Sequence, residues 1–263
     1  MEIVPPTGIG ATSISIAHLR AKESARTDRL FDDPYAARFV EAGGGAGWID
    51  GPDRGAHLFD LMAEQVALRT RFFDDALLAA ATPQVVLLAC GMDTRALRLP
   101  WPAGTRVVEL DLPDTLAFKD AVLRTPRTTV AADLRDDWPT ALAIAGWRSD
   151  LPTAWLAEGL LYALPAAAAD LLLDRITANS APDSMIAFDQ VERSDELVAA
   201  LTALDPRLAD LWQGGPPGDP GTWLARHGWR PDVHDVAELA DRFHRPRPAL
   251  FRTTHGWLVT ARR

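Results

Sequence analysis

Gln84-Val-Val-Leu-Leu-Ala-Cys-Gly-Met-Asp-Thr94 decides the fold, because an apolar, β-branched run ends there in a turn of small residues. A short apolar run that stops at a glycine is typical of a buried strand. Similar runs follow, separated by stretches rich in Ala and Leu, at 106–111, 128–133, 153–158 and 184–189. This alternation predicts an α/β sheet built from strand–helix–strand units with right-handed crossovers.

The flanking sequence extends this pattern in both directions. Two more strands are expected at 229–236 and 257–261, after an irregular loop, Gly214–Gly221. Helices are expected before the sheet, at 13–25 and 64–80. We therefore interpret the chain, 1–263, as a single domain, with a helical N-terminal extension over 1–80 and a core over 81–263.

Composition excludes several classes of protein. The 27 basic and 36 acidic residues give a net charge of −9, so the basic face of a nucleic-acid-binding protein is not expected. The single cysteine, Cys90, excludes a disulfide framework, and the six histidines have no metal-ligand spacing. The chain has no apolar run long enough to span a membrane, and its first ten residues do not resemble a signal peptide. We expect a cytoplasmic protein with no metal, no membrane contact and no nucleic-acid partner.

Acidic residues stand at the ends of four predicted strands: Asp111, Asp133, Glu158 and Asp189. Ligands of open parallel sheets bind beyond the carboxyl ends of the strands. Taken singly, Asp111 and Asp133 also fit solvated strand ends, and Asp93 fits a helix cap. Glu158 stands in an apolar run, where a lone carboxylate is costly unless it is paired. Together the four acids predict a binding site.

The turn after the first strand limits the choice of cofactor. A dinucleotide fold has G-x-G-x-x-G at this place, whereas this chain has one glycine, Gly91, and an acid that repels phosphate, Asp93. This disfavours a nicotinamide oxidoreductase, and neither a P-loop nor a G-x-S-x-G elbow occurs. An acid after the second strand suits two ribose hydroxyls. S-adenosyl-L-methionine, a positively charged nucleoside without phosphate, fits these features.

Several motifs occur in the order seen in a known family. They are Arg20-Ala-Lys-Glu-Ser24, Asp33-Pro-Tyr35, Arg69-Thr-Arg-Phe-Phe-Asp-Asp75, Ala89-Cys-Gly-Met-Asp-Thr-Arg95, Glu109-Leu-Asp-Leu-Pro113, Ala132-Asp-Leu-Arg135 and Ala157-Glu-Gly-Leu-Leu161. The chain thus resembles the leucine carboxyl methyltransferase family, in its bacterial S-adenosylmethionine-dependent branch with the tetracenomycin-type polyketide O-methyltransferases. The resemblance implies a class I methyltransferase fold, a Rossmann-like sheet that is mostly parallel with one antiparallel C-terminal strand. It also implies that the N-terminal helices form a lid.

The resemblance also implies a role for each matching residue. Arg69, and with it Lys22, would pair with the carboxylate of the cofactor, and the Ala89–Gly91 turn would pass beneath its methionine part. Asp111 would hold the ribose, Asp133 and Leu134 the adenine, and Glu158 the amino group near the sulfonium. Ala89 departs from the family, which usually has glycine there, and its methyl group would crowd the cofactor or shift the backbone.

The expected activity is O-methylation of a small-molecule carboxylate or acidic hydroxyl, in natural-product (secondary metabolite) biosynthesis. Glu158 and Tyr162 are the candidate catalytic residues, although Tyr162 also fits a core tyrosine. A phenol needs a general base and no histidine is expected at a strand end, so a carboxylate acceptor is favoured. The alternatives are a catalytically idle cofactor-binding scaffold or sensor and a methyltransferase of peptide C-termini, and both a monomer and a homodimer fit. The chain is shorter than the phosphatase-methylating members, which argues against a protein-phosphatase tail as substrate.

Overall fold

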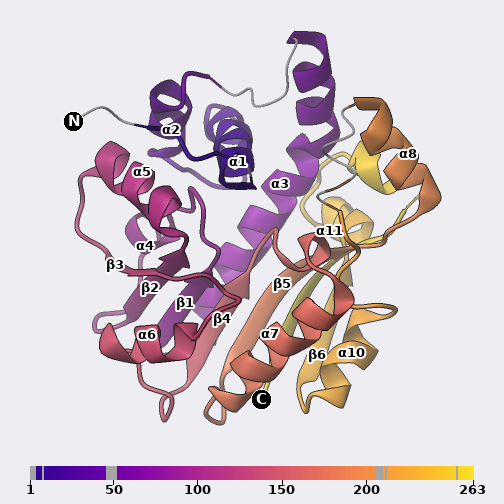
Figure 1. Ribbon diagram of the computed structural model, residues 1–263. Helices are drawn as coiled ribbons and strands as arrows, with labels where there is room; N and C mark the ends of the chain where they lie inside the picture. The colour runs from indigo at the N-terminus through magenta and orange to yellow at the C-terminus, as the bar shows by residue number, and fades with distance from the viewer. Residues whose placement is uncertain (1–3, 8, 46–51, 205–209, 211, 253) are drawn as a thin grey trace.

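The computed structural model describes residues 4–7, 9–45, 52–204, 210, 212–252 and 254–263 (Figure 1). Seven strands form one sheet in the order β3-β2-β1-β4-β5-β7-β6. Each predicted strand is confirmed within a few residues. The bounds are β1 Gln84–Leu88, β2 Arg106–Asp111, β3 Thr128–Ala131, β4 Thr153–Ala157, β5 Met185–Val191, β6 Arg230–Asp235 and β7 Gly256–Arg262.

Strand direction in this sheet follows the prediction. β1 pairs in parallel with β2 and β4, β2 pairs in parallel with β3, and β4 with β5. β7 is antiparallel to both of its neighbours, β5 and β6. The sheet is therefore mostly parallel with one antiparallel C-terminal strand. The chain leaves β1 toward β2 and β3 on one side and returns to β4 and β5 on the other, which places the topological switch point between β1 and β4.

Helices cover both faces of the sheet, and their local sequences explain where several of them begin. Pro113 opens α5, and Asp219 caps α10 by accepting a hydrogen bond from the Thr222 backbone. In the described residues the helices are α1 Ile9–Ser24, α2 Ala36–Ala42, α3 Pro52–Ala80, α4 Arg95–Arg98, α5 Pro113–Leu123, α6 Trp138–Ile144, α7 Ala166–Ala178, α8 Asp195–Leu204, α10 Pro220–Arg226 and α11 Val236–Arg242, with 3-10 turns η1 Leu161–Ala163 and η2 Ala249–Arg252.

The core consists of two apolar layers separated by the sheet. α6, α7 and α10 lie on the near face in Figure 1 and enclose a tryptophan-rich cluster that includes Trp138, Trp155 and Trp223. On the opposite face α3 and α11 bury Phe73 and Leu77 against the strands. β1 lies at the centre with all five of its residues buried. No helix in the described part of the chain has both the length and the hydropathy of a membrane span.

The N-terminal helices lie beyond the carboxyl ends of the strands. Figure 1 shows α1 and α2 above that end of the sheet, next to α5, while α3 descends behind the sheet. α1 starts a few residues earlier than predicted, α3 begins well before the expected residue 64, and α2 was not predicted. An apolar cluster that includes Ile14, Phe39 and Phe118 joins α1, α2 and α5. The extension is thus packed on the core above the expected ligand site.

Candidate functional site

A cavity of about 710 Å³ lies at the switch point, between the carboxyl ends of the strands and the N-terminal helices. α1 and α3 provide one wall, and the turns after β1, β2, β3 and β4 provide the other. The structure brings eight of the nine site residues expected from sequence into the lining of this cavity. They are Arg69, Ala89, Gly91, Asp111, Asp133, Leu134, Glu158 and Tyr162.

Asp111 is held rigidly at the end of β2 by the backbone. Its Oδ2 accepts a hydrogen bond from the Gly91 N–H at 2.6 Å, and its Oδ1 accepts one from the Leu112 N–H at 2.7 Å. Burial raises the pKa of Asp111, although both backbone bonds act in the opposite direction. Each oxygen keeps acceptor capacity, so the carboxylate has a fixed orientation toward a ligand with two neighbouring hydroxyls.

The turn after β1 is tight because two of its residues have left-handed backbones. Ala89 and Gly91 both have φ of 47°, a conformation that costs a residue with a Cβ more than it costs glycine. A Cβ on Gly91 would stand 2.7 Å from the Cβ of Ser13, so α1 packs directly on this turn. Ala89 therefore occupies a position that suits glycine, and it is one of the residues that line the cavity.

Asp133 lies half-buried after β3, with Leu134 beside it in the cavity lining. Its carboxylate accepts hydrogen bonds from the backbone N–H and the guanidinium of Arg135, an exposed side chain. These bonds lower the pKa of Asp133. A ligand that binds this carboxylate must therefore displace Arg135 or share the oxygens with it.

A buried ionic network forms the floor of the cavity around Glu158. Arg69 Nε lies 2.9 Å from Glu158 Oε1, and Arg95 Nη1 lies 2.6 Å from Glu158 Oε2. Arg69 also pairs with Asp189 at 3.0 Å, and Arg95 pairs with Asp93 at 2.5 Å. Asp189 in turn accepts the backbone N–H that follows Glu158 in the chain, at 2.6 Å. The strand-end acids thus hold arginines from α3 and α4 in fixed positions.

The arginines in this network keep Glu158 and Asp93 ionised. Burial alone would raise the pKa of Glu158, but Arg95 and Arg69 outweigh burial and lower it. The pKa of Asp93 is likewise lowered, mainly because Arg95 and Arg20 outweigh its burial. Burial raises the pKa of Asp189 more than Arg69 lowers it. Glu158 is therefore a carboxylate at neutral pH, with both oxygens already facing guanidinium groups, and it is a poor proton acceptor.

The basic residue that α1 supplies to the cavity is Arg20 and not Lys22. Arg20 is buried and lines the cavity, and it is fixed by Asp33 at 3.0 Å and by the Met92 carbonyl. Lys22 is exposed and is absent from the described lining. Residues two apart on a helix point to different sides, which explains why only one of the two reaches the cavity. Sequence reasoning missed Arg20, although the same motif contains it.

Tyr162, in η1, reaches the network with its hydroxyl. A Cβ built on Gly159 would be 3.6 Å from the Tyr162 hydroxyl and 3.7 Å from Arg69 Nη2, so both groups lie over the same backbone position. Burial and the neighbouring Asp189 raise the pKa of Tyr162 to about 12. Its ring stacks on Trp212, a cavity residue that the sequence did not single out. At neutral pH the hydroxyl is protonated and acts as a hydrogen-bond donor.

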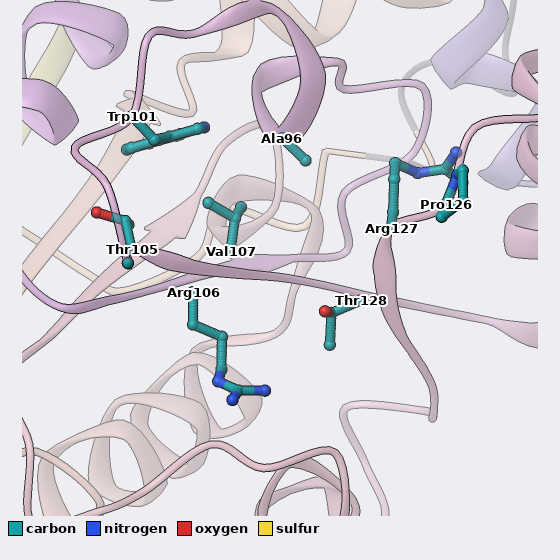
Figure 2. Close-up of a pocket in the computed structure, with 9 residues that line it drawn as sticks. Ala96, Trp101, Thr105, Arg106, Val107, Pro126, Arg127 and Thr128 are labelled. Carbon is teal, nitrogen blue, oxygen red and sulfur yellow. The ribbon is translucent and has the colours of Figure 1, made fainter.

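A second cavity, of about 410 Å³, lies at the opposite end of β2 and β3. Figure 2 shows that its two arginines, Arg106 and Arg127, point away from each other. Arg127 is already paired with Glu109 and Asp120, and Arg106 donates to the Ala145 carbonyl. These side chains do not converge on a ligand, and the cavity is at the amino ends of the strands, so it is not the candidate site.

This chain is similar to known proteins over most of its length. The sequence profile of the leucine carboxyl methyltransferase family matches residues 13–177. A Parafrankia protein is 46% identical over 97% of this chain and 87% of its own length, and a Frankia alni protein is 45% identical over 100% and 97%. Both are provisionally named S-adenosyl-L-methionine-dependent methyltransferases.

The fold recurs in a crystal structure from Thermobifida fusca YX, provisionally described as a methyltransferase. The TM-score is 0.60 at 17% identity, and the match covers 96% of this chain and 94% of that one. At this identity the likeness shows the fold alone.

Proposed function

The chain belongs to the leucine carboxyl methyltransferase family, whose methyl donor is S-adenosyl-L-methionine, and on that premise we propose that it methylates a carboxylate oxygen of a small molecule. The cofactor supplies an electrophilic methyl group on a positively charged sulfur. Its adenosine and methionine parts must fit the cavity described above. Methyl transfer then depends on how the residues of this chain hold the two reactants in line.

The charge of the cavity fits this cofactor. Its described lining has four carboxylates and three guanidiniums, which leaves one excess negative charge. S-adenosylmethionine has two positive charges and one negative charge, so the excess charge is complementary to it. Oriented Asp111 oxygens suit the ribose hydroxyls, and the lining contains no cluster of basic groups for a phosphate.

The remaining contacts to the cofactor follow from residue chemistry. Asp133 and the Leu134 backbone would hold the adenine once Arg135 moves aside. Arg69 and Arg20 both line the cavity, and each guanidinium has several N–H donors, so both can pair with the methionine carboxylate. Glu158 would attract the amino group from the floor.

The observation that carries the choice of acceptor is the lack of a general base at the floor of the described cavity, since the other two lining carboxylates, Asp111 and Asp133, are assigned to the ribose and the adenine. Its carboxylates near the floor, Glu158 and Asp93, have lowered pKa values, and Tyr162 is protonated. None of the described lining residues is a histidine. A phenol or alcohol would need a group that removes its proton, whereas a carboxylate is already ionised at neutral pH. These facts support a carboxylate acceptor over a hydroxyl.

Tyr162 and the cavity walls perform the remaining work of positioning. The Tyr162 hydroxyl can donate a hydrogen bond to the acceptor oxygen that is not methylated, and the walls exclude water. The mostly apolar lining supports a small molecule over a peptide C-terminus, whose backbone amides would need partners. Together with the sequence motifs shared with polyketide O-methyltransferases, this supports a role in natural-product biosynthesis.

The test is methyl transfer from radiolabelled S-adenosylmethionine to paired probes, namely benzoic acid against benzyl alcohol and 2-naphthoic acid against 2-naphthol. We expect label in the acids only, released as methanol by mild alkali because the product is a methyl ester. Label that resists alkali would indicate an ether and would refute the carboxylate assignment. S-adenosylhomocysteine binding without any transfer, to the probes or to a small-molecule cell extract, would indicate a catalytically idle scaffold.

A further inference from the structure

One part of the cavity lining is aromatic. The rings of Tyr162 and Trp212 are stacked, with centroids 4.8 Å apart and planes 17° from parallel. Trp212 is buried, at 5% exposure, and both rings line the cavity. Met62, from α3, packs against the same cluster and also lines the cavity. Rings and thioether together form a wall of high polarisability.

A glycine-rich loop before α10 fixes this wall. The Gly214 N–H donates to the Tyr162 carbonyl and the Gly215 N–H donates to the Leu164 carbonyl, both at 3.0 Å. Gly215 has φ of 65°, and a Cβ there would be 2.7 Å from the Leu161 carbonyl oxygen. Only glycine allows this close approach. The loop thus locks the Trp212 segment to the segment that carries Tyr162.

The cavity lining is mostly apolar, with Gln213 as a polar residue beside Trp212 in the chain. Its other lining residues include Ile16 and Leu19 from α1 and Leu160 after β4, which are apolar. Arg69 and Glu158 line the cavity at the end where the Tyr162 hydroxyl lies, whereas Arg193, which donates to the Trp212 carbonyl, is not among the described lining residues. A ligand with a flat, apolar body and one anionic end near Arg69 therefore fits this part of the cavity.

We propose that the Tyr162–Trp212 wall selects planar aromatic monocarboxylic acids and that Trp212 determines this specificity. The inference rests on the proposed function and names its substrate class. A planar ring makes contact over its whole face with an aromatic wall, whereas a saturated ring is thicker and makes fewer contacts. The carboxylate then lies at the Tyr162 hydroxyl, and the ring lies against Trp212 and Met62.

The experiment compares planar and saturated acids of the same carbon skeleton. The probes are benzoate against cyclohexanecarboxylate and 2-naphthoate against decahydro-2-naphthoate, with kcat/KM measured for wild type, Trp212→Phe and Trp212→Leu. We expect wild type to prefer the planar acids about tenfold, the upper end of the stacking energy of one aromatic pair. Trp212→Phe should keep most of this preference, and Trp212→Leu should reduce it to about twofold.

Controls separate failure of this inference from failure of the proposed function. S-adenosylhomocysteine affinity, measured by calorimetry, should be the same in all three proteins. The second control is Trp229→Phe, which should leave the preference for planar acids unchanged. It removes an indole that donates to Thr177 away from the cavity. The wild-type panel alone is decisive, whether or not Trp212→Leu folds. The inference is overturned if wild type uses the saturated acids as well as or better than the planar ones. It is also overturned if wild type binds the cofactor but neither binds nor methylates an aromatic acid. If wild type does not bind S-adenosylhomocysteine, the proposed function is overturned instead.

Discussion

Ala89 shows how one residue links backbone strain to the site. It has a left-handed backbone at a turn where glycine is better suited, and it lines the cavity. Ala89→Gly should stabilise the fold by up to about 1 kcal/mol, since relief of strain exceeds the added chain entropy of glycine. It should also tighten S-adenosylhomocysteine binding, because space opens beside the cofactor.

A matched control for Ala89→Gly exists elsewhere in the chain. Ala81 has a similar φ of 50°, but it is exposed at the end of α3 and does not line the cavity. Ala81→Gly should give a similar gain in denaturant stability without a change in affinity. Equal affinity changes in both variants, or none in either, would contradict a role for the Ala89 methyl group at the cofactor.

Asp111 carries the most direct prediction about cofactor binding. Asp111→Asn keeps an oxygen for one backbone N–H but removes the charge and one acceptor. We expect S-adenosylhomocysteine affinity to fall by about 1.5–3 kcal/mol, the usual range for hydrogen bonds to a charged group. Calorimetry measures this loss, with Asp114→Asn, an exposed site three residues on, as the control. Unchanged affinity would remove Asp111 from the ribose site.

The site was predictable from sequence where position along a strand decides it. Asp111, Asp133 and Glu158 follow strands whose carboxyl ends meet, so their convergence follows from topology. Their partners were not predictable in this way. Arg20 lines the cavity in place of the expected Lys22, because residues two apart on a helix point to different sides. Arg95 contacts Glu158 although the two residues are distant in sequence. Trp212 lines the cavity through a loop distant in sequence, and no local pattern indicates that contact.

At the scale of elements, strands were easier to predict than the N-terminal helices. The strands are apolar runs bounded by turn residues, and the short spacings between them indicate parallel pairing through right-handed crossovers. α2 has seven residues, which is too short for a helical period to stand out, and the first turns of α3 precede the apolar stripe on which the prediction relied. The extension is defined by tertiary contacts that periodicity does not reveal.

Arg245 is one such contact, and it ties the N-terminal helices to the C-terminal half. It follows α11 and pairs with Glu23 of α1 at 2.7 Å and with Glu64 of α3 at 2.9 Å. Arg245→Gln leaves two largely buried carboxylates without this partner and should destabilise the fold by about 3 kcal/mol. We also expect faster proteolysis within α1 and weaker cofactor binding, because α1 closes the cavity.

The control for Arg245 lies two residues further on. Arg247 pairs with Asp241 on the surface, where both side chains are more than half exposed, so Arg247→Gln should cost less than about 1 kcal/mol. Urea unfolding and limited proteolysis of both variants make the comparison. A protease-resistant α1 in Arg245→Gln, with wild-type cofactor affinity, would show that the N-terminal helices do not act as a lid held by this residue.

At the scale of the whole molecule, three distant parts of the chain must meet to complete the cavity. The N-terminal helices supply Arg20 and Arg69, the parallel half of the sheet supplies the strand-end acids, and the loop before α10 supplies Trp212. Binding and catalysis therefore depend on the packed fold as a unit. We expect cofactor binding and global unfolding to be lost together in denaturant, whereas an independent N-terminal unit would give two transitions.

The same arrangement fixes how the rate depends on pH. Between about pH 6 and 9 an acceptor carboxylate is ionised, since its pKa lies near 4. Glu158 and Asp93 stay ionised because their pKa values are lowered, Arg69 stays charged because its pKa is raised, and Tyr162 stays protonated with a pKa of about 12. With benzoate as acceptor, kcat should therefore be nearly constant across this window.

Asp111 is the lining group that can produce an acid limb, because burial raises its pKa and protonation removes its charge at the ribose. Below about pH 6 the KM for the cofactor should therefore rise as the pH falls. This rise should be absent in Asp111→Asn. A clear titration of kcat near pH 7, abolished by Tyr162→Phe or by replacement of one histidine, would reveal a working general base. The acceptor would then be a hydroxyl, because only a hydroxyl must lose a proton during transfer.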